Sequence, residues 1–199
     1  MKLSDAAIES GDVFLFHGRA PHSRLIELHT NSDISHAALA LTVRCFPGGQ
    51  PILCIEALEG KGVRCCPLDR YLVECAAEDC RVDWYAVDPC WGAEKGKMLK
   101  AEAGAEAAAF AVEQLGKDYV SMGQLSWSFG WLGSTFRRLL AWCRPAANLN
   151  PDRWFCSELV AGCHKKAGFP VDEDPALISP ADVARFPWLT LRGALEPDQ

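Results

Sequence analysis

Apolar residues in the first half of the chain come in short runs separated by turn-forming residues. The run at 13–16 follows a Gly-Asp pair and predicts a buried strand. The runs at 35–43 and 52–58 flank a segment rich in proline and glycine, which predicts a β-hairpin. Alternating or apolar runs at 62–67 and 81–87 predict two further strands. This half of the chain therefore predicts an antiparallel sheet.

Helical spacing dominates the second half. An alanine-rich segment at 94–115, ended by Gly116, predicts the longest helix. A turn at 148–152 precedes a helix that runs to Lys166 and is ended by Gly168. Ser179 predicts the cap of one more short helix, and residues 20–28 also have helical character. Together the patterns predict an α+β domain in which helices pack against an antiparallel sheet.

A tryptophan-rich segment covers about residues 120–150. Trp127, Trp131, Leu132 and Leu139 lie near helical spacing, which favours a helix that faces the core. The alternative is a lid or groove for an apolar substrate. We treat the segment as an insertion in a single domain formed by residues 1–199.

Composition and charge exclude several classes of partner. A chain of 199 residues with 49% apolar content can bury the core of one compact domain. The net charge of -6 argues against binding to nucleic acid or to an anionic membrane surface, since both favour basic proteins. No apolar run is long enough for an integral membrane segment, and residues 1–10 do not resemble a signal peptide. A cytoplasmic location is expected; the oligomeric state is not indicated.

Ten cysteines are present, but their spacing is poor for a metal site. No Cys-x-x-Cys motif occurs, and Cys163-His164 has no second pair. We therefore expect neither a metal nor a cofactor. In a reducing compartment most of the cysteines would be thiols that fill the core, as expected for Cys45, Cys54, Cys143 and Cys163.

Cys156 is the strongest candidate nucleophile. Together with Leu159, Val160 and Cys163 it lies on the apolar face of the last long helix. It also lies in the first turn, where unpaired N–H groups and the helix dipole favour a negative charge. A thiol reacts as its thiolate, so this position suits nucleophilic chemistry. An inert core cysteine is the alternative.

His36 is the best candidate partner for this thiol. It shares its strand face with Ala38 and Ala40, and small residues would let the cysteine helix approach closely. The alternative is a histidine with a purely structural role. Eight residues beyond Cys156, or about 12 Å along the helix, His164 is too far for proton transfer. His17 is expected to be solvated and is kept as the reserve candidate.

Glu56 interrupts an apolar strand, where a carboxylate needs a polar partner. A turn centred near residues 46 and 47 sets Glu56 opposite His36 or one diagonal step away, on the same face. The carboxylate would then orient the imidazole. The alternative is a carboxylate that points to water.

The order of these residues resembles the circularly permuted branch of the NlpC/P60 cysteine hydrolases, which have a papain-like fold. The similarity covers about residues 11–169 and rests on five short motifs: Gly11-Asp12, Ser35-His36, Glu56 in Ile55-Glu56-Ala57, Gly116-Lys117-Asp118-Tyr119, and Cys156-Ser157-Glu158-Leu159-Val160.

The resemblance implies that Cys156 is the nucleophile, His36 the general base and Glu56 the residue that orients it. It also implies that Ser35 and Tyr119 bind the substrate. The expected reaction is hydrolysis of an amide bond, in a peptide or a cell-wall-type peptide, through an acyl-enzyme. Two alternatives remain open: a lipid acyl-hydrolase or acyltransferase that uses the same triad, and a binding domain without catalysis. Family members that cut cell-wall peptides are generally exported, and this sequence shows no export signal.

Overall fold

A six-stranded antiparallel sheet forms the centre of the protein. The computed structural model describes residues 1–18, 32–43, 50–88, 91, 100–120 and 152–198. The strand order is β4-β3-β2-β1-β5-β8, and every neighbouring pair is antiparallel. The strands are β1 (Val13–His17), β2 (His36–Thr42), β3 (Ile52–Leu58), β4 (Gly62–Pro67), β5 (Arg81–Val87) and β8 (Leu189–Leu195). The first five confirm the predicted strands, whereas β8 was not predicted.

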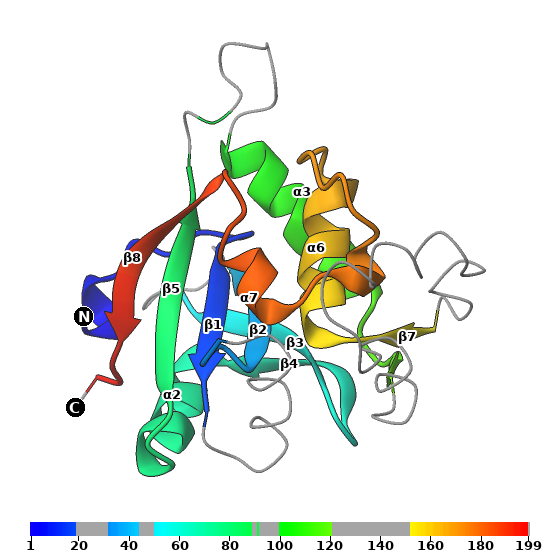
Figure 1. Cartoon of the computed structure of the whole chain (residues 1–199). Coiled ribbons are helices and arrows are strands. Elements are labelled where there is room, and N and C mark those ends of the chain that lie inside the picture. The colour runs from blue at the N-terminus through cyan, green and yellow to red at the C-terminus, as the bar shows by residue number, and fades with distance from the viewer. Residues whose placement is uncertain (19–31, 44–49, 89–90, 92–99, 121–151, 199) are drawn as a thin grey trace.

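Helices cover both faces of the sheet (Figure 1). On one face, α3 (Lys100–Glu113) and α6 (Cys156–Lys166) pack side by side. The shorter α2 (Leu68–Ala77), which was not predicted, contacts β3, β4 and β5. The remaining elements are η1 (Leu3–Asp5), η3 (Pro175–Leu177), α7 (Pro180–Val183) and the short parallel pair β6 (Asp118–Tyr119) and β7 (Arg153–Trp154). The α+β class is confirmed.

The predicted helix ends are also found. Gly116 and Gly168 have φ values of 84° and 86°, in the left-handed region that glycine adopts readily. The Ser179 hydroxyl accepts a 3.3 Å hydrogen bond from the Asp182 N–H at the start of α7. Residues 20–28, 94–99 and 121–150 lie outside the described residues, so the expectations for the first helical segment and for most of the tryptophan-rich segment stay predictions.

Two apolar cores lie on opposite faces of the sheet. The core under α3 and α6 contains Ala37 and Leu39 from β2, whereas Ala38 and Ala40 belong to the core under α2. The expected use of the second pair was therefore wrong: they do not form the surface on which the cysteine helix packs. Alternation along β2 places residues 37 and 39 on that face instead.

A close backbone contact fixes α3 against the start of β1. A Cβ added to Gly104 would lie 2.1 Å from the Ser10 carbonyl oxygen, and one added to Gly11 would lie 2.4 Å from the Gly104 Cα. Only glycine allows this approach. The Gly11-Asp12 motif is thus partly explained by packing.

Replacing Gly104 with alanine is expected to lower the free energy of unfolding by about 2 kcal/mol or more, because helix and strand must separate to admit the methyl group. Urea unfolding followed by circular dichroism would measure the change. Ala105→Gly, on an exposed position of the same helix, is the control for helix propensity; an unchanged midpoint for Gly104→Ala would contradict the predicted clash.

His164 joins three segments within the core. It is fully buried, its Nε2 lies 3.0 Å from the Gly11 carbonyl oxygen, and its Nδ1 accepts a 2.9 Å hydrogen bond from the Trp188 indole N–H. Burial lowers the pKa of His164 to about 4. The ring is therefore neutral near pH 7 and has a structural role.

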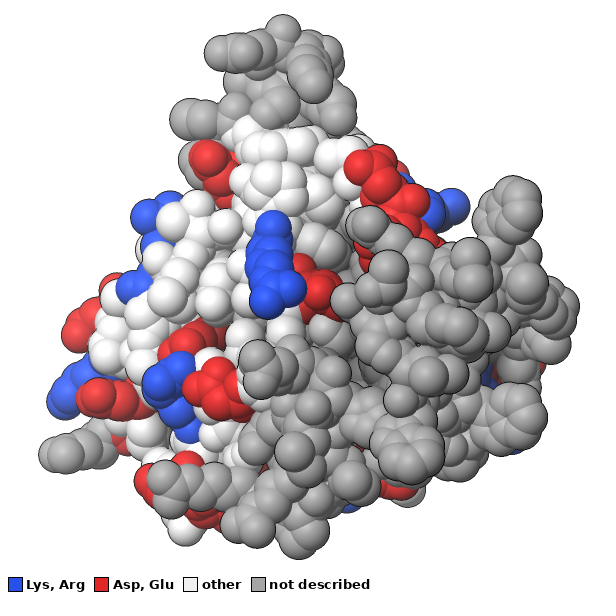
Figure 2. Space-filling view, viewed as in Figure 1, with Lys and Arg blue, Asp and Glu red and all other residues white. Residues whose placement is uncertain are grey.

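The surface of the described residues carries charges of both signs. In Figure 2, lysine and arginine side chains lie among aspartate and glutamate side chains on the described part of the face. No helix in the described part of the chain combines the length and the apolar character needed to cross a membrane.

Candidate active site

Cys156 is the first residue of α6 and is only 1% exposed. The preceding turn is held by a 3.1 Å hydrogen bond from the Phe155 N–H to the Glu158 carboxylate. This contact satisfies a backbone donor at the helix start. The adjacent Ser157 hydroxyl donates to the Ile178 carbonyl oxygen at 2.6 Å. The sequence therefore fixes the nucleophile candidate at an anchored helix N-terminus.

His36 and Glu56 meet on the α2 side of the sheet. The pairing of β2 with β3 sets Ala40 opposite Cys54 and Leu39 opposite Ile55. One further step along this register sets Glu56 opposite Ala38, so His36 lies one diagonal step away on the same face. The His36 Nε2 lies 2.5 Å from the Glu56 Oε2, and the carboxylate is fully buried. The predicted hairpin register and the predicted contact are both present.

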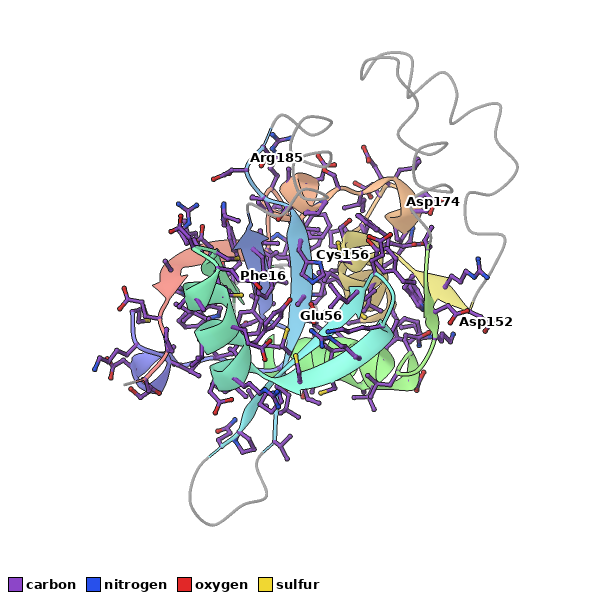
Figure 3. The ribbon with its side chains drawn as sticks, turned by 90° about the horizontal axis from the view of Figure 1, so that it is seen from below. Phe16, Glu56, Asp152, Cys156, Asp174 and Arg185 are labelled. Carbon is purple, nitrogen blue, oxygen red and sulfur yellow. The ribbon has the colours of Figure 1, made fainter. Side chains whose placement is uncertain are left out.

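Cys156 and His36 also interact, although α6 packs on the other face of the sheet and the two residues are 120 positions apart; each is the first residue of its element. In Figure 3, Cys156 at the start of α6 faces the strands that carry His36 and Glu56. Because Nε2 is held by Glu56, Nδ1 is the ring nitrogen left for the thiol. Burial lowers the pKa of His36, but the charge and hydrogen bond of Cys156, followed by those of Glu56, outweigh it and raise the pKa to about 10.

Glu56 has two further partners. The Arg64 Nε–H donates to Oε1 at 2.8 Å, the Arg64 Nη2 forms an ion pair with Oε1 at 2.6 Å, and the Tyr71 hydroxyl donates to Oε2 at 2.9 Å. Burial raises the pKa of Glu56, but the hydrogen bond and charge of His36, followed by those of Arg64, lower it to about 2. The carboxylate is therefore ionised across the range in which most proteins are stable.

Neither Arg64 nor Tyr71 was singled out from the sequence. The pairing of β3 with β4 sets Arg64 directly opposite Glu56, across a turn centred on Gly60. The sequence Glu59-Gly60-Lys61 indicates this turn. Residues at equal distances from Gly60 pair across it, so Glu56 and Arg64 are opposite each other. Tyr71 comes from α2, and without that helix its position could not be predicted.

Tyr119 of β6 lies close to the start of α6. Its ring centroid is 5.7 Å from that of Phe155, the residue before Cys156. Burial, followed by the charge of Cys156, raises the pKa of Tyr119, so the phenol keeps its proton. The Tyr119 ring thus lies beside the residue that precedes the candidate nucleophile.

Ser35 is engaged with the backbone of the neighbouring strand. Its hydroxyl donates to the Phe16 carbonyl oxygen at 3.2 Å and accepts from the Gly18 N–H at 3.2 Å. The side chain is buried. These bonds anchor the residue before His36 to the end of β1.

His17 was expected to be solvated, and this was wrong. Its side chain is only 9% exposed, and its two ring nitrogens each lie 2.9 Å from a carboxylate, Nδ1 from Asp33 and Nε2 from Asp83. Arg81 also contacts both carboxylates. The residues come from different strands and a loop, so their meeting depends on sheet order. No contact between His17 and Cys156 is found among the described residues.

Metal-binding geometry was tested across the described part of the chain. No group of three or more His, Cys, Asp or Glu side chains there is arranged to hold an ion. The described cysteines are all free thiols: Cys54, Cys65, Cys66, Cys75, Cys80, Cys156 and Cys163. Cys45 and Cys143, which were expected to fill the core, lie outside the described residues.

Comparison with known proteins supports the fold. No protein-family model matches the sequence, and no curated protein matches it. The structure is similar to the crystal structure of the metalloprotein YiiX from Escherichia coli O157:H7, of family DUF1105. The TM-score is 0.60 with 19% sequence identity, and the match covers 95% of this chain and 98% of the YiiX chain. YiiX has a permuted papain-like fold, so the likeness extends to the architecture expected from the motifs.

Proposed function

We propose that this protein is a cysteine-dependent hydrolase that cleaves an amide bond through Cys156, His36 and Glu56. The observation that carries the proposal is the buried chain of contacts from the thiol at the start of α6, through His36, to the Glu56 carboxylate. A thiol, an imidazole and a group that orients the imidazole are the parts that nucleophilic acyl chemistry requires. The papain-like architecture shared with YiiX supports this interpretation.

In the proposed reaction, the thiol proton already lies on His36, whose pKa is raised to about 10, when the Cys156 sulfur attacks the carbonyl carbon of the substrate. The carbonyl oxygen becomes an oxyanion. The backbone N–H of Cys156 lies in the first turn of α6 and can donate to this oxygen. Tyr119 keeps its proton, its ring lies beside that of Phe155, and its hydroxyl is the second donor that we propose for the substrate.

Collapse of this intermediate breaks the carbon–nitrogen bond. His36 gives its proton to the departing amine, and the acyl group stays on sulfur as a thioester. A water molecule, deprotonated by His36, then attacks the thioester and releases the acid. For Ser35 we propose a supporting role in place of substrate contact, because its hydroxyl is bound to the backbone beside His36.

The likeness to a metalloprotein raises the question of a metal in this chain. Within the described residues, the side chains around Cys156 offer no set of three ligands, and Glu56 is already bound to His36, Arg64 and Tyr71. These residues do not fit a metal site. We therefore assign no step of the reaction to a metal.

One observation favours a second candidate function, a binding domain without catalysis. Cys156 is only 1% exposed, and an occluded thiol is the feature expected of such a domain. The two candidates differ in whether a small reagent reaches a thiolate at this position.

Alkylation by iodoacetamide at pH 7 distinguishes them. We expect Cys156 to react about 10-fold faster than the exposed Cys65, because a neighbouring imidazolium favours the thiolate. Peptide mapping by mass spectrometry after timed quenching would give both rates from one sample. Labelling of Cys65 ahead of Cys156 would favour the binding domain and contradict the hydrolase.

A further inference from the structure

The two oxygens of Glu56 are divided between two kinds of partner. Oε1 accepts a hydrogen bond from Arg64 Nε and forms an ion pair with Arg64 Nη2, whereas Oε2 is shared by His36 and Tyr71. Rotation of the carboxylate would break all of these contacts. Glu56 is thus fixed in one orientation by groups on β2, β4 and α2.

Ring packing holds the same partners in place. The Phe16 ring lies 5.3 Å from the His36 ring and 4.9 Å from the Tyr71 ring, measured between centroids. The Arg64 guanidinium carbon lies 5.7 Å from the centroid of the Tyr71 ring, within the range of a cation–π contact. Arg64 and Tyr71 therefore support each other as well as Glu56.

We propose that Arg64 and Tyr71 are positioning residues of the site, which keep Glu56 ionised and aimed at His36. This inference rests on the proposed function for its catalytic meaning, but the contacts exist independently of it. With Arg64 included, the contacts run from the Cys156 thiol to the His36 imidazole, the Glu56 carboxylate and the Arg64 guanidinium. Without Arg64, the buried carboxylate would lose its only cation other than His36 among the described residues.

Other ionisable groups near Glu56 are thiols. The charge of Glu56 contributes to the raised pKa of Cys54 and of Cys75, and it opposes the lowering of the Cys66 pKa. A change in the titration of Glu56 after removal of Arg64 would therefore reflect loss of the guanidinium, since these thiols stay in place.

The first test follows Glu56 itself. In protein labelled with 13C at glutamate side chains, the carboxyl resonance of Glu56 reports its titration without any reaction. Arg64→Gln is expected to raise the midpoint by about one pH unit, and Tyr71→Phe to raise it by a smaller amount. Arg70→Gln, which removes an exposed arginine that pairs with Glu74, is the matched control and should leave it unchanged. An unchanged midpoint in Arg64→Gln would overturn the inference.

The second test follows Cys156. The rate of Cys156 alkylation by iodoacetamide falls as the pH is lowered. The midpoint of this fall is expected to lie about one pH unit higher in Arg64→Gln than in the unaltered protein, and Arg64→Lys is expected to restore at least half of the shift. If the alkylation rate of Arg64→Gln is lower at every pH by the same factor and its midpoint does not move, Arg64 has a structural role and the positioning role is overturned.

The two proposals fail in different ways. If Cys156 of the unaltered protein is alkylated more slowly than Cys65, the proposed hydrolase is contradicted. The NMR titration of Glu56 still decides whether Arg64 and Tyr71 hold its carboxylate. If Cys156 is fast and depends on His36, but neither titration moves, only the positioning role is overturned.

Discussion

His36→Asn is expected to slow the alkylation of Cys156 at pH 7 by about 100-fold, because the side chain that accepts the thiol proton and balances the thiolate is lost. The raised pKa of His36, about 10, means that the ring of the unaltered protein holds a proton beside the sulfur near neutrality. Asparagine can still accept or donate a hydrogen bond, but it cannot carry the charge. Timed labelling with iodoacetamide and peptide mapping would measure the rate.

His17→Asn is the matched control. His17 also lies at the end of a strand and is bound by carboxylates, but these are Asp33 and Asp83. The rate at Cys156 should stay within about twofold of the unaltered protein, since the two sites share no described contact. Equal losses in both variants would point to a general loosening of the sheet and would remove the case for His36 as the base.

Glu56→Gln is expected to lower the free energy of unfolding by about 3 to 5 kcal/mol at pH 6, since it leaves the charges of His36 and Arg64 without their buried partner. An amide also presents a donor where the carboxylate accepts from Tyr71 or His36. Urea unfolding of the two proteins would give the difference.

This difference should depend on pH in a defined way. The folded-state pKa of Glu56 is lowered from 4.5 to about 2, so its stabilisation is fully present above pH 4.5 and is lost as the pH falls through 2. The pKa of His36 is raised from 6.5 to about 10, so its contribution is fully present below pH 6.5 and is lost as the pH rises through 10. The difference should therefore be largest between about pH 4.5 and 6.5.

Glu74→Gln provides the comparison for charge alone, because Glu74 is an exposed residue of α2 that pairs with Arg70. Its effect should stay within about 0.5 kcal/mol at every pH. A Glu56→Gln variant as stable as the unaltered protein at pH 6 would show that the buried contacts contribute nothing net.

Residues in strongly patterned elements were predictable from the sequence. Cys156 follows from the apolar spacing of α6, and His36 and Glu56 follow from the β2–β3 hairpin, whose register is set by alternation and by the turn. The contact between the hairpin and the helix start was harder to foresee. It was inferred from chemistry and from a family resemblance, and the expected packing surface of Ala38 and Ala40 was on the wrong face.

The missed elements have weak patterns for physical reasons. β8 is an edge strand in which only Leu195 is buried, and its pairing with β5 shifts between Trp84 and Tyr85. α2 buries only Leu68, Leu72 and Cys75 among charged residues. Both signals are faint because little apolar area is buried.

The site predicted from the sequence was therefore incomplete. Tyr71 lies on the unpredicted α2, and Arg64 depends on the register of the second hairpin. The cluster around His17 draws on β1, β5 and a loop, and no local pattern predicts which distant carboxylates will meet.

The saturation of Glu56 has a consequence for the path of the proton in the proposed reaction. All described donors around the carboxylate already point at it, and the pKa values of about 2 for Glu56 and about 10 for His36 leave a proton overwhelmingly on the ring. Transfer onward to the carboxylate would be steeply uphill. The proton removed from the Cys156 sulfur therefore stays on the imidazole of His36 and does not pass on to Glu56. From His36 it can be transferred only to the substrate or back to the thiolate.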